Sequence, residues 1–180
     1  MIYLNVEKNT LRTPLKLAMA AVFGALVCVA TLILVLPIPA TTGYFNLGET
    51  VIYTAAFLFG PLVGGIAGGA GAAIADMIGY AHFAPGTLII KGFEGAIVGF
   101  LYTKIQKRTG NPNLSAILSV TIGGLEMVVG YFIYEQLVLG YPLTLALAEV
   151  PFNIVQMLVG LIVAVAIMHV VLRFFPQLKS

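Results

Sequence analysis

Three polar side chains recur at helical spacing within a long apolar segment near the C-terminal end of the chain. Glu149, Asn153 and Gln156 occupy positions i, i+4 and i+7, and an α-helix places such positions on one face. One carboxylate and two carboxamides supply hydrogen-bond donors and acceptors along this face. The pattern predicts a polar stripe that faces inward and binds a small polar molecule.

Charged side chains on two further apolar segments indicate the same kind of chemistry. Lys91 and Glu94 lie three residues apart, and Asp76 lies on the preceding segment. Ionisable groups in a membrane are costly, so they normally face the bundle interior or a watery cavity and mark a ligand or ion path. We expect Lys91 to pair with Glu94, or with Asp76 as its counter-ion. A neutralised pair that only ties helices together is the alternative, and the two roles can coexist.

Aromatic residues gather in two loop-like segments, Tyr44-Phe45-Asn46 and the stretch that holds Tyr80, His82 and Phe83. A tyrosine at a membrane interface is most often an anchor. Together with a proline-broken loop, however, these rings predict an aromatic lid over a flat ligand. His82 is interpreted as a surface histidine and not as a metal ligand, because no second histidine or cysteine is near.

The composition excludes a water-soluble globule as the frame for these residues. Of 180 residues, 60% are hydrophobic and 9% are charged, whereas soluble domains carry charge at about a quarter of their positions. Six bilayer spans of about 20 residues account for the apolar total. Turn signals delimit six predicted helices, at 17–36, 47–59, 62–79, from the Pro85-Gly86 turn to Ile105, at 114–139 and at 143–175. The second is too short to cross fully, and Pro37, Pro39 and Gly43 predict an extended loop or lid before it.

The basic residues assign an orientation to these spans. All but Lys91 fall on one side of the predicted membrane: Lys8, Arg12, Lys16, Lys104, Lys107, Arg108, Arg173 and Lys179. Cytoplasmic segments are enriched in lysine and arginine, so both termini are predicted to be cytoplasmic. The prediction is an all-α integral membrane protein of the cell membrane, with six transmembrane helices in a single domain covering residues 1–180.

Charge and cysteine content exclude other partners and chemistries. The net charge of +2 comes from basic residues beside apolar runs, which suits a membrane surface and not nucleic acid. The single Cys28 provides neither a disulfide framework nor a cysteine metal cage.

The acidic residues lie unevenly across the predicted membrane. Glu49, Asp76, Glu94, Glu135 and Glu149 fall in its outer half together with Lys91, and Glu126 lies near mid-depth. A proton or ion path needs polar groups through the full thickness, so this asymmetry predicts a pocket that is open to the outside and closed below. Glu126 and Glu135, with Tyr131 and Tyr134, are expected along the same cavity, although Glu135 is close enough to the surface to be solvated instead.

Two other functional classes stay open at this point. A self-sufficient ion-coupled secondary carrier or small channel would use Asp76, Glu94 and Glu126 to carry its coupling ion, and a structural scaffold would bind no ligand. The chain contains no phosphate-binding loop, so ATP-driven uptake would need hydrolysis on another polypeptide. It also lacks a serine-nucleophile motif and an HExxH zinc motif, so we expect no enzyme.

Small residues predict close helix contacts. Gly64/Gly68 and Gly65/Gly69 are overlapping small-xxx-small pairs, which let helix backbones approach closely in lipid. Ala21 and Ala25 have the same spacing on the first span. Spacing alone favours internal packing for this pair, and a docking face for another membrane protein is the alternative.

An ordered set of short motifs resembles one known family. Phe45-Asn46-Leu47-Gly48-Glu49 is followed by Phe59-Gly60-Pro61, then by Asp76, and then by Lys91-Gly92-Phe93-Glu94-Gly95. In this order they resemble the substrate-binding S components of energy-coupling factor (ECF) vitamin transporters, and especially the riboflavin, hydroxymethylpyrimidine and pyridoxine branch.

The resemblance implies a mechanism and partners. Six helices would bind a vitamin near the outer surface, under the loop that follows the first helix. Ala21 and Ala25 would contact a transmembrane T component that sits on two cytoplasmic ATPase subunits. Those partners would use ATP, so that this chain needs no cofactor, and the whole S component would topple in the membrane to deliver its ligand to the cytoplasm.

Two features that the sequence lacks help to order the candidate substrates. The chain has no tryptophan, on which the thiamine-type members rely, and it begins Met1-Ile2 where nickel and cobalt members begin Met-His. The expected substrate is a small hydroxylated aromatic heterocycle, pyridoxine or hydroxymethylpyrimidine, followed by riboflavin and a queuosine precursor. The residues predicted to bind it are Tyr44, Asn46, Glu49, Asp76, Tyr80, His82, Lys91, Glu94, Tyr131, Glu149, Asn153 and Gln156.

Overall fold

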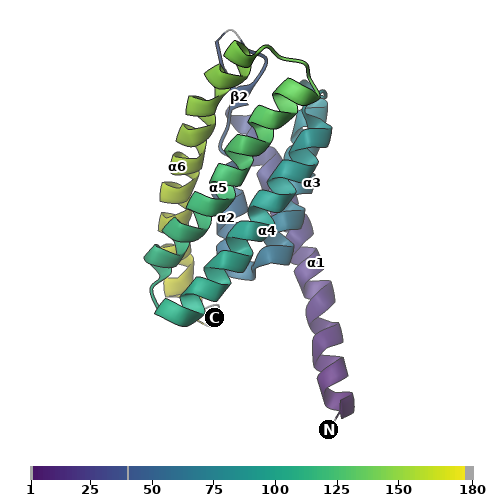
Figure 1. Cartoon of the computed structure of the whole chain (residues 1–180). Coiled ribbons are helices and arrows are strands. Elements are labelled where there is room, and N and C mark those ends of the chain that lie inside the picture. The colour runs from purple at the N-terminus through teal and green to yellow at the C-terminus, as the bar shows by residue number, and fades with distance from the viewer. Residues whose placement is uncertain (1, 40, 177–180) are drawn as a thin grey trace.

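The described part of the chain forms a bundle of six helices, with a short hairpin between the first two. The computed structural model describes residues 2–39 and 41–176, with residues 2–12 as backbone alone. The helices are α1 (Ile2–Ile33), α2 (Gly48–Phe59), α3 (Pro61–Gly79), α4 (Ala84–Thr109), α5 (Pro112–Leu137) and α6 (Leu143–Phe174). They run side by side, and α1 begins at the end of the bundle where α6 ends (Figure 1). The predicted all-helical class is confirmed.

Five of these helices are long and apolar enough to cross a membrane: α1 from residue 13 on, α3, α4, α5 and α6. The remaining helix, α2, has 12 residues. At a rise of 1.5 Å per residue it spans about 18 Å, which is less than the roughly 30 Å of a bilayer core. The sequence-based expectation that this segment is too short to cross fully agrees with its length.

The loop after α1 contains a hairpin that the sequence analysis did not predict. β1 (Leu36–Pro37) pairs antiparallel with β2 (Tyr44–Phe45). Because residue 36 already belongs to this pairing, α1 ends at Ile33 and not at the predicted residue 36. The hairpin lies at the end of the bundle opposite the first residues of α1 (Figure 1).

Glycine and proline set the sharp turns between consecutive helices. Gly60 has φ 83°, a value that L side chains rarely adopt, and Pro61 opens α3 directly after it. Gly110 ends α4 at φ 66°. The Asn111 side chain then caps α5 by accepting from the backbone N–H groups of Asn113 and Leu114. These turns reverse the chain within a few residues, so that α2, α3, α4 and α5 pack as consecutive neighbours.

The glycine face of α3 packs against α4 so closely that the two helix backbones are in contact. A Cβ atom added to Gly68 would lie 2.7 Å from the carbonyl oxygen of Lys91, and one added to Gly95 would lie 2.3 Å from the carbonyl oxygen of Gly64. Neither position therefore tolerates a side chain without displacement of a helix. The predicted packing role of the small-xxx-small pairs agrees with this geometry, which brings α3 and α4 together beside the Lys91 side chain.

The buried face of α1 is not the one that the alanine spacing favoured. Ala20, Val27 and Thr31 are buried, whereas Ala21 and Ala25 are exposed. The prediction that Ala21 and Ala25 pack internally is therefore wrong. The reason is rotational: Ala20, Val27 and Thr31 recur at i, i+7 and i+11 and share one face of α1, whereas Ala21 and Ala25 lie on a face turned by roughly 100° or more from it.

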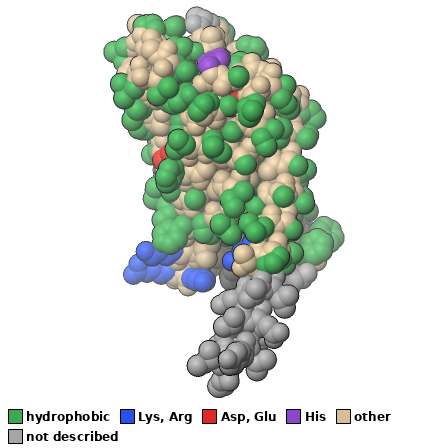
Figure 2. All heavy atoms as spheres, turned by 90° about the vertical axis from the view of Figure 1, so that its right-hand side faces the viewer, with side chains coloured by type: hydrophobic (Ala, Val, Ile, Leu, Met, Phe, Trp, Pro, Cys, Tyr) green, Lys and Arg blue, Asp and Glu red, His purple; other side chains and the backbone are tan. Residues whose placement is uncertain are grey.

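The outer surface of the bundle is apolar along most of its length, and its basic side chains gather at one end (Figure 2). Lys16, Lys104, Lys107, Arg108 and Arg173 are all exposed. The side chains of Lys8 and Arg12, and the whole of Lys179, lie outside the described residues, so the predicted placement of these three is not described. An apolar girdle with a basic end is typical of a membrane protein.

The α3–α4 contact generates a stability prediction. Gly68→Ala should lower the melting temperature of the detergent-purified protein, because overpacking of this kind costs about 1–3 kcal/mol. Gly79→Ala is the matched control: it lies on the same helix, and a Cβ there meets nothing within 4 Å. Equal melting temperatures for the two variants would show that the close approach of α3 and α4 is not required.

Candidate functional site

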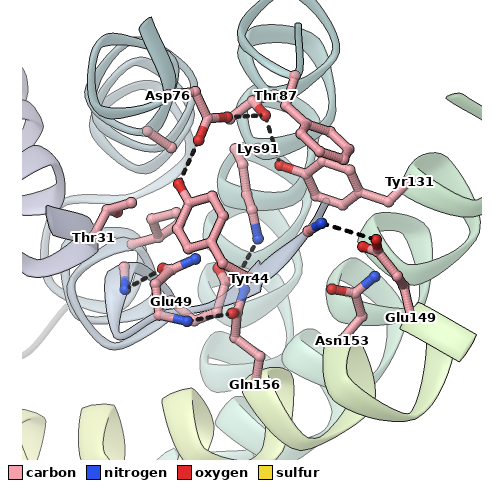
Figure 3. A pocket seen from close by; sticks show the side chains of 16 residues that line it. Thr31, Tyr44, Glu49, Asp76, Thr87, Lys91, Tyr131, Glu149, Asn153 and Gln156 are labelled. Carbon is pink, nitrogen blue, oxygen red and sulfur yellow. Dashed lines mark hydrogen bonds and ion pairs between the residues drawn. The ribbon is translucent and has the colours of Figure 1, made fainter. Parts of the chain in front are cut away.

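A pocket lies beneath the hairpin, lined by residues of the hairpin loop and of the helix ends next to it, and Figure 3 shows the side chains around it. Its cavity volume is about 40 Å³, which is room for a few water molecules. Its lining comes from the hairpin loop and from every helix: Thr31, Gly43, Tyr44, Asn46, Gly48, Glu49, Ile52, Ala72, Asp76, Phe83, Thr87, Lys91, Tyr131, Glu149, Asn153 and Gln156.

The structure brings most of the sequence-predicted residues together at this pocket. Those that line it are Tyr44, Asn46, Glu49, Asp76, Lys91, Tyr131, Glu149, Asn153 and Gln156. The Glu149, Asn153 and Gln156 stripe of α6 faces inward along one wall, as its spacing indicated. Tyr80, His82 and Glu94 do not line the pocket.

Sequence reasoning missed the remaining lining residues. Thr31 and Thr87 are hydroxyl side chains in apolar runs, a weak signal that becomes informative only when both helices face one cavity. Gly43, Gly48, Ile52 and Ala72 carry no polar group by which to find them, and Phe83 was expected in the lid without being assigned to binding.

Lys91 forms the electrostatic centre of the pocket floor. Its ammonium group pairs with Glu49 Oε1 and lies 3.3 Å from Glu94 Oε2. Gln156 Nε2 donates to the same Glu49 Oε1 at 2.7 Å, and the Tyr53 hydroxyl donates to Glu94 Oε1 at 2.6 Å. All of these groups are buried. A buried charge is tolerated only when it is paired and hydrogen-bonded, so this cluster holds α2, α4 and α6 in register.

Of the two partners predicted for Lys91, the prediction of Glu94 is confirmed and that of Asp76 is wrong. Glu94 pairs with it, as predicted, and Glu49 joins from α2. Asp76 is not its counter-ion: the Asp76 carboxylate accepts hydrogen bonds from the Tyr44 hydroxyl and, at 2.5 Å, from the Thr87 hydroxyl. Tyr131 extends this network, with its hydroxyl 2.9 Å from Thr87 Oγ1.

The hairpin loop closes the pocket through specific contacts. Gly43 N donates to Glu149 Oε1 at 3.1 Å, and Asn46 N donates to Gln156 Oε1 at 2.8 Å. The Tyr44 ring stacks on Tyr80 with ring centroids 4.1 Å apart. A Cβ atom at Gly43 would lie 2.0 Å from the Glu149 carboxylate, so glycine is what allows the loop to approach this side chain.

Tyr44 reaches into the pocket as a hydrogen-bond donor. Burial raises the pKa of its phenol well above the ordinary value, and the neighbouring Asp76 charge adds to the rise. The phenol therefore stays protonated at physiological pH and donates to the carboxylate, linking the loop to α3.

Other predicted residues lie around the pocket and not on it. Tyr80 supports Tyr44, as described above, and His82 Nε2 lies 3.2 Å from the Thr42 hydroxyl on the outer surface of the loop. Glu135 is fully buried beside Glu149 and is not solvated. Glu126 is half-buried on α5, and neither of these two glutamates lines the pocket.

This arrangement offers aromatic faces and hydrogen-bonding groups to a small solute. The walls combine two tyrosine rings with carboxylates, carboxamides and hydroxyls, and a hydrogen-bonded loop covers them. Among the described residues, no three or more histidine, cysteine, aspartate or glutamate side chains form a group able to hold a metal ion. The fold and the pocket together define a membrane-embedded solute-binding protein.

Comparison with known proteins gives the family. The family model for the S component of the ECF-type riboflavin transporter matches residues 12–173. A thiamine precursor transporter, HmpT of Lactococcus lactis subsp. cremoris (strain MG1363), is 35% identical over 151 residues, which are 83% of this chain and 82% of that protein. An uncharacterized protein of Pyrococcus woesei is 46% identical over 138 residues, 76% of this chain and 88% of its own length.

A solved structure shares the fold. It is described as the S component of a bacterial ECF transporter, is 21% identical, and superimposes with a TM-score of 0.69 over 91% of this chain and 98% of its own. The chain belongs to the S-component family of ECF transporters. This is a family of membrane-embedded transporter components and not an enzyme family.

The ion cluster generates a second prediction. Lys91→Met should lower the melting temperature strongly, because removing one partner of a buried ion pair costs about 3–5 kcal/mol. Lys104→Met is the control, since Lys104 lies on the same helix but is exposed, and its change should stay within about 0.5 kcal/mol. Adding Glu94→Gln to Lys91→Met should recover part of the loss. A Lys91→Met protein as stable as Lys104→Met would contradict the pairing.

Proposed function

We propose that this chain is the high-affinity vitamin-binding subunit of an ECF importer. Its substrate is a small hydroxylated aromatic heterocycle, with hydroxymethylpyrimidine and pyridoxine ahead of riboflavin. The observation that carries the proposal is the covered pocket, in which Tyr44 and Tyr131 supply aromatic faces and side chains from α2, α3, α4 and α6 supply hydrogen-bonding groups. The relative described as a thiamine precursor transporter supports a pyrimidine, and the family model supports riboflavin as the next candidate.

The charge of the pocket narrows the form of the substrate. Glu49, Asp76 and Glu149 contribute carboxylates, and the one lysine of the lining, Lys91, is already paired. A phosphate ester would bring negative charge next to these carboxylates without a free cation to meet it. The pocket therefore suits the unphosphorylated vitamin, in neutral form or with a basic nitrogen.

The orientation in the membrane follows from the basic end of the bundle. The exposed lysines and arginines described above lie at the end where α1 begins and α6 ends, and such residues are enriched on the cytoplasmic side. Both termini are then cytoplasmic, the pocket faces the outside, and α2 enters the membrane from the outer side without spanning its full thickness.

Energy for uptake comes from partner subunits in this proposal. Two ATPases and a transmembrane T component act on the S component, which topples in the membrane to release its ligand into the cytoplasm. The exposed Ala21 and Ala25 offer a smooth strip on α1 for the T component.

The substrate prediction is tested by native mass spectrometry of gently purified protein, followed by thermal-shift titration. Hydroxymethylpyrimidine or pyridoxine should co-purify and raise the melting temperature, and their phosphate esters should not. A ligand-free protein that no vitamin stabilises would overturn the proposal.

The α6 stripe gives a third prediction. Glu149→Ala and Asn153→Ala should each weaken binding of the stabilising vitamin by about tenfold or more, since a buried hydrogen bond to a ligand contributes on the order of 1–3 kcal/mol. Lys107→Ala, on the exposed basic end, should bind as the wild type does. Isothermal titration of the three variants decides this, and equal losses would contradict the assignment.

Docking to the T component gives a fourth prediction. Ala25→Trp should leave vitamin binding intact but abolish co-purification with the T component and ATP-dependent uptake, because a bulky ring blocks close helix approach. Ala166→Trp, at an exposed alanine of α6, should retain both. Uptake by this chain alone in ATP-free liposomes would instead favour an ion-coupled carrier.

A further inference from the structure

Two buried side-chain oxygens in the pocket wall have no hydrogen-bond partner: Thr31 Oγ1 and Glu49 Oε2. Their residues are 2% and 1% exposed. The other buried side-chain oxygens without a hydrogen-bond partner, among the described residues, belong to Glu94, Glu126 and Glu135, none of which lines the pocket, and that of Glu94 is ion-paired with Lys91. Buried polar atoms without partners are rare in native proteins because they lose the hydrogen bonds of water. These two therefore mark a place where a ligand supplies the partner.

Thr31 differs from several other threonines in the helices of this bundle. The hydroxyls of Thr54, Thr103 and Thr121 each donate to the backbone carbonyl four residues earlier. This carbonyl is a common hydrogen-bond acceptor for a threonine within a helix. Thr31 is also within a helix, yet its hydroxyl makes no such bond. It lies against Gly48, where a Cβ atom would come within 2.6 Å of Thr31 Oγ1. Only a glycine at position 48 allows the chain to pass this close to the hydroxyl.

Glu49 presents its second oxygen as an acceptor alone. Both of its protein partners, Lys91 Nζ and Gln156 Nε2, use Oε1. The ion pair keeps the carboxylate charged, so Oε2 accepts a hydrogen bond and cannot donate one. Thr31 and Glu49 lie on the same side of the pocket, where α1 meets the start of α2 (Figure 3).

We infer that Thr31 and Glu49 Oε2 form a specificity subsite for an amino group adjacent to a ring nitrogen. The amino N–H would donate to Glu49 Oε2, and the ring nitrogen would accept from the Thr31 hydroxyl. A 4-aminopyrimidine carries this edge, whereas a pyridine with a ring hydroxyl distant from its nitrogen does not. The inference rests on the proposed function and selects the aminopyrimidine among its candidate substrates.

The test compares hydroxymethylpyrimidine with its analogue in which an oxo group replaces the amino group. Wild-type protein should bind the amino compound about tenfold or more tightly, because the oxo group turns an acceptor toward the Glu49 carboxylate. Thr31→Val should weaken binding of the amino compound about tenfold, and Thr31→Ser should stay within about threefold of the wild type. Thr54→Val, which removes a buried threonine hydroxyl outside the pocket lining, is the matched control and should bind normally.

A measurement without ligand separates a binding role from a structural one. Replacing an unpartnered buried hydroxyl with a methyl group does not break any hydrogen bond, so Thr31→Val should melt at or above the wild-type temperature, and a lower melting temperature would contradict the inference. If Thr31→Val binds the amino compound as tightly as the wild type does, the subsite inference is refuted and the proposed function is not affected. Wild-type protein that binds none of the heterocycles would overturn both.

Discussion

A lysine ammonium group buried inside a membrane bundle must be surrounded by carboxylates, and this requirement organises the protein. Lys91 meets Glu94 from its own helix and Glu49 from α2, and Gln156 of α6 reaches it through the Glu49 oxygen that they share. Isolated, each of these groups would destabilise the bundle. Together they join three helices at one level and become the floor of a pocket.

The rest of the site depends on backbones that approach unusually closely. Glycines on α3 bring it against α4, so that Asp76 and Thr87 come within hydrogen-bonding distance of each other. At the opposite wall, Gly43 lets the loop N–H reach Glu149. Tyr44 then joins the loop to α3 by donating to Asp76. The cover over the pocket is therefore part of the same polar network as its walls, so that opening the loop breaks several bonds at once.

This network also accounts for the kind of solute that a member of the ECF S-component family with this pocket would hold. Most polar groups of the pocket wall already hydrogen-bond to one another. Aromatic faces and a few free hydrogen-bonding atoms therefore remain for the ligand. The pocket lining contains more carboxylates than lysines, and this favours uncharged or basic heterocycles over anions. In the proposed subsite, recognition depends on the oxygen atoms of Thr31 and Glu49 that have no hydrogen-bond partner in the protein.

Local pattern was sufficient for much of this architecture. Apolar length and turn residues predict the helices to within a few residues at most ends, and the spacing of Glu149, Asn153 and Gln156 predicts their common face, because periodicity is a property of one segment. Local patterns did not predict four features: the partner of Asp76, the buried face of α1, the hairpin and the role proposed for Thr31. All of these but the hairpin depend on how two segments far apart in the chain rotate against each other. That rotation is set by close packing at glycines and by the pairing of Lys91, which no single stretch of sequence contains.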